Sequence, residues 1–265
     1  TGSNNTALGS EALKSNTTAS NNTAVGYQAL FDNTTGANNV ALGLQALSNN
    51  TTASYSTAVG YQALYLNTTG RNTAFGNGAL FSNTIGNVNT AIGDQTLVLN
   101  STGSYNVALG HSALYSNTTA NNNVAVGYQA LYDTTTGGAN VALGYTALAN
   151  NTTGTSNVAL GYGTLISNTT ANNNTAVGTS SMTAITIGIG NTAVGSQTML
   201  AGTTAARNTA MGYAALRDNT NNDNTAIGYF ALEANTSGAN NVAVGTNALL
   251  ANTTASNNVA VGYQA

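Results

Sequence analysis

The sequence contains no cysteine, no proline and no tryptophan, and its four Lys and Arg and seven Asp and Glu leave a formal net charge of −3 over 265 residues. The absence of cysteine excludes disulfide bonds and thiolate chemistry. Four cations exclude a strongly basic nucleic-acid binder, because recognition of a phosphate backbone needs clustered Lys and Arg. No apolar run approaches the ~18 residues of a membrane-spanning helix, so we expect no membrane insertion by this segment. A hydrophobic content of 42% is too high for a charged, disordered chain.

The motif Thr/Val-Ala-apolar-Gly recurs along the whole chain. Thirteen of its fifteen intervals are 17 residues long and two are 16, and both short intervals lose a residue in the same linker, around Arg71 and around Asp223. This periodicity predicts a single repeat domain over residues 1–265, which we expect to be a window of a longer fibre. Positions below are counted from the motif glycine, called the repeat glycine, which stands at residues 9, 26, 43, 60, 76, 93, 110, 127, 144, 161, 178, 195, 212, 228, 245 and 262.

The residues before the repeat glycine alternate as in a β-strand. Position −3 is Thr or Val and position −2 is Ala in all sixteen repeats, and position −1 is always a large apolar residue. Leu or Met at +4 in all fifteen complete repeats, often after Ala at +3, predicts a second short strand. A 17-residue period is too short for a helical hairpin, and Asn, Thr, Val and Gly are poor helix formers. The sequence therefore predicts an all-β fold, a parallel β-solenoid (β-roll) of about sixteen 17-residue coils.

Two asparagine positions indicate side-chain ladders along such a solenoid. Asn occupies −4 in fifteen of sixteen repeats, with Ser56 as the exception, and +7 in twelve of fifteen, while Thr occupies +8 in fourteen of fifteen. An amide both donates and accepts, so stacked amides can bond to one another or cap turns. Stacked like charges would repel, which explains the scarcity of charge. In two representative repeats the expected ladder residues are Asn22, Ala24, Gly26, Leu30, Asn33 and Thr34, and Asn106, Ala108, Gly110, Leu114, Asn117 and Thr118.

The first strand is apolar on both faces, with Ala on one and Thr/Val and a large apolar residue on the other. A strand buried on both faces needs two partners. The second segment of its own coil can cover the alanine face, and another chain is the simplest cover for the other. We therefore expect a parallel homo-oligomer, with a trimer favoured.

The run Asn22-Thr23-Ala24-Val25-Gly26 and its continuation through Leu30 to Asn33-Thr34-Thr35-Gly36 resemble a known repeat type. The motif Asn-Thr/Val-Ala-Val/Leu-Gly is similar to the head repeat of trimeric autotransporter adhesins. It is still more similar to the arrays of bacterial and phage proteins described as tail-fibre-like. The resemblance covers all sixteen repeats. It implies trimeric, left-handed parallel β-rolls that serve as heads or shafts of surface fibres.

For several residues, a role in binding is an alternative to a role in packing. The tyrosines at +1 are interpreted as stacking partners, with an aromatic stripe for contact with a glycan or another surface as the alternative. The Thr rows raise ice binding as a rival, although threonines at +8 and +9 are adjacent and should point to opposite sides. These +1 tyrosines are Tyr27, Tyr61, Tyr128, Tyr145, Tyr162, Tyr213, Tyr229 and Tyr263.

Other features are given structural interpretations. His111 replaces Tyr in the +1 row and is interpreted as a surface substitution rather than a ligand or base. The Asn-Thr-Thr triplets, as at Asn16, Asn33 and Asn67, match the N-glycosylation pattern but follow the ladder spacing. Residues 179–207 form atypical coils, where Met182, Met199, Ile185 and Gly202 break the +4 and +7 patterns. Local repacking is the favoured explanation, and a contact site or fibre boundary is the alternative.

These observations predict a structural segment, shaft or head, of an extracellular surface fibre of a cell or virion. The segment would act as a rigid rod and could contribute to surface attachment. A binding module that uses a ladder face for glycan or ice is the alternative. One histidine and unpaired carboxylates predict no enzyme, no metal site and no cofactor. The expected partners are sister chains and a cell-surface glycan or other surface, with no nucleic acid.

Overall fold

The computed structural model describes residues 2–265 and contains one short strand in each coil, with no helix in that range. The chain forms two compact units, Thr1–Thr136 and Gly137–Ala265, and the same repeat builds both. The single repeat domain expected over 1–265 stays a prediction.

The first unit contains β1 (Thr6–Leu8), β2 (Thr23–Val25), β3 (Val40–Leu42), β4 (Thr57–Val59), β5 (Asn72–Phe75), β6 (Asn89–Ile92), β7 (Val107–Leu109) and β8 (Val124–Val126). The second contains β9 (Val141–Leu143), β10 (Val158–Leu160), β11 (Thr175–Val177), β12 (Thr192–Val194), β13 (Thr209–Met211), β14 (Thr225–Ile227), β15 (Val242–Val244) and β16 (Val259–Val261).

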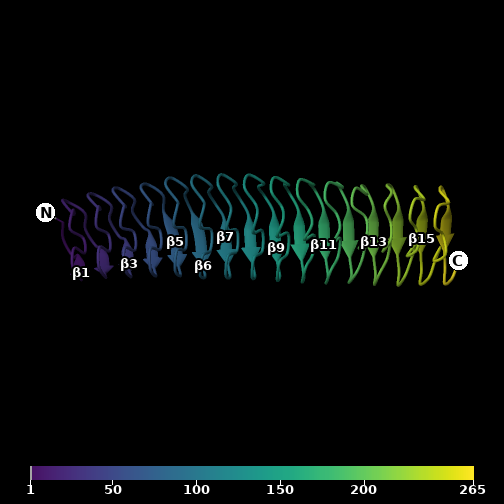
Figure 1. Cartoon of the computed structure of the whole chain (residues 1–265), viewed down its shortest axis with the longest axis horizontal. Coiled ribbons are helices and arrows are strands. Elements are labelled where there is room, and N and C mark those ends of the chain that lie inside the picture. Colours follow the sequence, from purple (N-terminus) through teal and green to yellow (C-terminus); the bar gives the residue numbers. More distant parts are fainter. Residues whose placement is uncertain (1) are drawn as a thin grey trace. The chain divides into compact units, whose positions relative to one another are not determined.

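Within each unit, every strand pairs in parallel with the strand of the next coil (Figure 1). The register places each residue on its counterpart, so that Ala24 pairs with Ala41 and Val25 with Leu42. The all-β parallel solenoid with a 17-residue coil is therefore confirmed.

The inside of each coil is narrow and is filled by small side chains around one leucine. Ala24 at −2, Ala29 at +3 and Leu30 at +4 are fully buried, while Thr23 and Val25 on either side of Ala24 are partly exposed. The alternation expected for the first strand is confirmed, and the alanine face is the inner one. Because Ala adds little width, the strand lies close to the rest of its own coil.

The second strand expected after the repeat glycine is wrong. Gln28 at +2 and Leu30 at +4 have left-handed backbones with φ of 54° and 52°, and the segment consists of turns. It nevertheless bonds between coils as a strand would. The Gln28 N–H donates to the Ser10 carbonyl at 3.0 Å and the Leu30 N–H donates to the Ala46 carbonyl at 3.0 Å. Leu does not favour a left-handed backbone, so the sequence gives no sign of this conformation at +4. The complete burial of the Leu30 side chain offsets the backbone cost.

The two short coils lose a residue in loops, as expected, but not at the same place. Arg71 is not left-handed and β5 begins directly after it, so this coil lacks the left-handed residue at +12. Asp223 keeps that conformation, with φ of 61°. In its coil the Asn221 carbonyl accepts from Asn208 Nδ2, a bond that the +10 carbonyl accepts in other coils, so the lost position is +9.

The repeat glycines form a column that admits no side chain. Gly76 has φ of 136°, and a Cβ placed on it would overlap the carbonyl oxygen of Gly93 in the next coil. Gly78, two residues later, has φ of 63° and open space around it.

Gly76→Ala is expected to lower the free energy of unfolding by about 3 kcal/mol or more, because the methyl group collides with backbone and the φ is open only to glycine. Gly78→Ala is the matched control in the same coil and is expected to cost only about 1 kcal/mol. Urea unfolding of both variants measures the difference. Equal losses would show that the glycine column does not set the coil spacing.

Candidate functional site

The first asparagine ladder joins each strand to the next coil and to a turn. Asn22 Nδ2 donates to the Gly36 carbonyl at 2.9 Å, and Asn22 Oδ1 accepts from the Asn39 N–H at 2.9 Å. Both asparagines are fully buried. Each amide therefore uses its donor on a turn and its acceptor on the next coil, which are the two roles expected of it.

The second ladder links amide to amide. Asn50 Nδ2 donates to Asn33 Oδ1 at 2.8 Å and also to the Ala53 carbonyl three residues on, at 3.1 Å. Thr34 Oγ1, beside this ladder, donates to the Thr51 carbonyl of the next coil at 2.9 Å. The threonine hydroxyls at +8 are thus directed along the stack.

The second representative repeat has the same arrangement. Ala108 and Leu114 are fully buried, and Gly110 has φ of 128°. The remaining contacts are Asn106 Oδ1 with the Asn123 N–H at 3.0 Å, Asn117 Nδ2 with Asn100 Oδ1 at 2.6 Å, and Thr118 Oγ1 with the Thr135 carbonyl at 3.1 Å.

The second ladder is interrupted where the repeat loses its +7 asparagine. Asn117 Oδ1 and Asn168 Oδ1 are buried without a hydrogen-bond partner. The reason is that the next coil offers Thr134 and Ile185, respectively, at the position of the donating amide. A buried acceptor without a partner costs free energy.

The atypical coils 179–207 keep the first ladder. Asn191 N–H donates to Asn174 Oδ1 at 2.9 Å, and Asn208 N–H donates to Asn191 Oδ1 at 3.0 Å. Met182 and Met199 lie fully buried in the leucine column. The substitutions therefore repack the interior without breaking the stack.

The outward strand face, defined by positions −3 and −1, is an apolar surface in each unit. Leu109 is 43% exposed and Leu42 is 47% exposed, although both belong to strands. None of the eleven charged residues stands at −3 or −1 in any repeat. A continuous uncharged apolar surface of this kind is typical of an interaction site.

The tyrosines at +1 continue this face, and neighbouring rings stack on one another. Tyr145 and Tyr162 lie 5.2 Å apart between ring centroids, and Tyr213 and Tyr229 lie 5.5 Å apart. Each stacked ring covers one face of its neighbour, which favours the packing interpretation. All eight are exposed at their edges: Tyr27, Tyr61, Tyr128, Tyr145, Tyr162, Tyr213, Tyr229 and Tyr263.

His111 lies in the +1 column, stacked on Tyr128 with 5.5 Å between ring centroids. Its Nε2 is 3.5 Å from Asp94 Oδ2, and its Nδ1 is 3.0 Å from Ser112 Oγ. Asn77 Nδ2 donates to Asp94 Oδ1 at 2.7 Å. Asp94, His111 and Ser112 have the composition of a nucleophilic triad, but Ser112 is only 3% exposed, so its hydroxyl is not open to a substrate.

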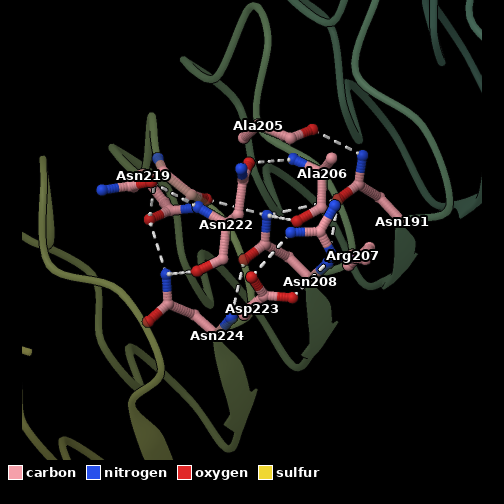
Figure 2. Close-up of polar contacts among 10 residues, drawn as sticks. Asn191, Ala205, Ala206, Arg207, Asn208, Asn219, Asn222, Asp223 and Asn224 are labelled. Atoms are coloured by element: carbon pink, nitrogen blue, oxygen red, sulfur yellow. Dashed lines mark hydrogen bonds and ion pairs between the residues drawn. The ribbon is translucent and has the colours of Figure 1, made fainter. Parts of the chain in front are cut away.

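Charged pairs are concentrated near the second short coil, where Figure 2 shows the Arg207 side chain turned toward Asp223. Arg207 Nε and Nη2 each donate to a different oxygen of Asp223, both at 2.7 Å. These bonds raise the pKa of Arg207 and lower the pKa of Asp223. Arg217, at +5 of this short coil, donates to Asp218 at 3.0 Å and contacts Glu233 at +5 of the next coil, and its bonds to Asp218 raise its pKa.

Comparison of the chain with protein-family models and with curated protein sequences gives no match. Within residues 2–265, no three His, Cys, Asp or Glu side chains gather as a metal site would require. No helix in this range is long and apolar enough to span a membrane. The function is therefore argued from the geometry of the ladders and the outward strand face.

Restoring the second ladder should stabilise the chain. Thr134→Asn supplies a donor to the orphaned Asn117 Oδ1 and is expected to add about 1 kcal/mol to the free energy of unfolding. The reverse change, Asn50→Thr, orphans Asn33 Oδ1 in an intact stretch and should cost about 1–3 kcal/mol. Chemical denaturation of both variants tests whether the two substitutions change the free energy of unfolding in opposite directions. A destabilising Thr134→Asn would contradict the ladder account.

The carboxyl group of Asp223 should titrate below its ordinary range, and Arg207→Gln should restore an ordinary pKa. Because the folded-state pKa is the lower one, the pair contributes stability above about pH 4 and loses it as the pH falls through the lowered pKa. Carboxyl ¹³C chemical shifts measured against pH give the midpoint in both proteins. An unchanged midpoint in the variant would show that Arg207 is not the cause.

Proposed function

We propose that this chain is a structural segment, shaft or head, of an extracellular fibre on a cell or virion surface, and that it works as a parallel homotrimer. The observation that carries the proposal is the outward strand face, whose apolar columns contain no charge and are exposed or half-buried in the described residues. Burial of apolar surface stabilises by roughly 25 cal/mol per Å². A row repeated at every coil therefore gives a long interface for sister chains.

The bonding between coils supports a mechanical role. Within each unit, each inner coil bonds to the coil before it and to the coil after it, through strand backbone, turn backbone and buried amides. A coil cannot leave this stack without breaking bonds to two neighbours. Such cooperativity suits a stiff segment that holds another part of a fibre at a distance.

A binding module is the second candidate function. Its supporting observation is the exposure of tyrosine edges along the +1 column. Glycan is a better ligand than ice for such a module. The Thr34 hydroxyl donates to a neighbouring carbonyl, as do others of the +8 row, so this row does not present free hydroxyls to a crystal surface.

The paired substitution Leu42→Glu and Leu109→Glu should dissociate the assembly. Both side chains are exposed in the single chain, so the fold survives, but like charges would face one another between sister chains. Light scattering after size exclusion should give three times 26.4 kDa, or 79.2 kDa, for the native chain and 26.4 kDa for the variant. Ser82→Glu, at the +6 position where Asp32 and Asp133 occur naturally, is the control and should remain a trimer. A native chain that elutes as a monomer would reject the trimer.

A further inference from the structure

A second exposed surface lies on the loops that precede β4, β5, β6 and β7. Tyr55, Arg71, Val88 and Tyr105 occupy these four successive loops, and Ile85 shares the loop of Val88. All five are exposed, with Tyr55 at 66% and Tyr105 at 59%. We call these five residues the loop patch. Its backbone is held between coils, since the Val88 N–H donates to the Arg71 carbonyl at 2.8 Å.

Arg71 brings a cation without a counter-ion to this surface. Among residues 2–265, no carboxylate lies within ion-pair distance of its guanidinium. A free guanidinium offers a planar fork of N–H donors that fits a carboxylate with two hydrogen bonds. The other three cations are paired, Lys14 with Glu11, Arg207 with Asp223, and Arg217 with Asp218 and Glu233.

The two tyrosines of the loop patch differ from the stacked tyrosines of the +1 column, such as Tyr145 and Tyr162. Neither Tyr55 nor Tyr105 contacts another ring within the described residues, so neither stacks as Tyr145 and Tyr162 do. Their faces are therefore not covered by other aromatic rings. An open aromatic face can pack against the C–H face of a sugar ring.

The conformation of these residues indicates that bulky side chains are retained there at a cost. Tyr55, Val88 and Tyr105 are left-handed, with φ of 62°, 55° and 60°. This conformation suits Asn and disfavours β-branched and bulky residues. Strain of this kind is often retained where a side chain serves a function. The same position is Asn in seven other coils, at residues 4, 21, 38, 122, 173, 240 and 257.

We propose that the loop patch binds an acidic oligosaccharide. Arg71 holds a sugar carboxylate with two hydrogen bonds, and the rings of Tyr55 and Tyr105 pack on sugars to either side. The two tyrosines are three coil steps apart, or about 14 Å along the stack, with Arg71 between them. One unpaired cation gives too little charge for a nucleic-acid backbone. The inference does not rest on the trimer, because every residue of the patch belongs to one chain.

The test measures binding of trigalacturonate and sialyllactose to the full 265-residue chain by calorimetry, with galactotriose and lactose as neutral counterparts. At least one acidic sugar should bind, its neutral counterpart should bind at least tenfold more weakly, and added salt should weaken binding. Arg71→Gln is expected to lower the affinity at least tenfold. Tyr55→Asn and Tyr105→Asn should also weaken binding while leaving the unfolding temperature unchanged or higher, because Asn suits the left-handed backbone.

Arg207→Gln is the matched control for Arg71→Gln and should bind as the native chain does, because the Arg207 guanidinium is already paired with Asp223. Tyr27→Asn distinguishes the loop patch from the +1 column. Binding that survives Arg71→Gln and both tyrosine substitutions would overturn the proposal, as would absence of binding to both acidic sugars. Loss of binding in Tyr27→Asn alone would show that the glycan binds at the +1 column and not at the loop patch. The native mass by light scattering is measured on every variant, so that failure of the loop patch and failure of the trimer give different results.

Discussion

Within each unit, the residues of an inner coil lie on their counterparts in the neighbouring coils, except where a short coil lacks one, and the rest of the structure depends on this constraint. A position can be filled only by a side chain that tolerates a copy of itself about 5 Å away. Alanine, leucine, asparagine and threonine meet that condition in the columns described above, and charge does not. The glycine column meets it by having no side chain, since the next carbonyl occupies the space. The polar interior is stable because an amide such as that of Asn22 has a partner for its donor and for its acceptor, and the second ladder leaves an acceptor without one only where it is interrupted, as at Asn117.

The same constraint leaves an outer strand face that stays partly exposed in each unit. The inward residue of each strand is always Ala, and the residues on either side of it face outward with apolar atoms. Charges are confined to loops, turns and the edges of this face, including the pairs around Arg207 and Arg217. An apolar outer face and loops that vary between coils suit the fibre segment proposed above. In these proposals, the outward strand face contacts sister chains and the loop patch around Arg71 binds an acidic oligosaccharide.

Much of this could be predicted from spacing alone. The strand before each glycine, its inner alanine and the asparagine ladders follow from periodicity, because identical neighbours leave few ways to satisfy an amide. The turn around Leu30 could not, since leucine in a left-handed backbone contradicts its local preference and only its burial explains it. Gly78, Gly163 and Asn247, which occupy +2 in place of the usual Gln, are the sequence signals of that conformation. The loop patch could not be predicted, because Tyr55, Arg71 and Tyr105 are isolated departures from the consensus in separate repeats. Only the fold places them on one surface.

Amide hydrogen exchange tests the coil-on-coil account most directly, because it measures the turn segment and the strands in one experiment. The Leu47 N–H lies outside any strand but donates to the Ala63 carbonyl of the next coil at 3.0 Å. Leu47 and its counterparts at +4 are expected to exchange as slowly as the strand amides, since only opening of the stack exposes either. Fast exchange at +4 beside slow exchange in the strands would contradict it, because the turns would then be surface loops and the strands alone would hold the coils together.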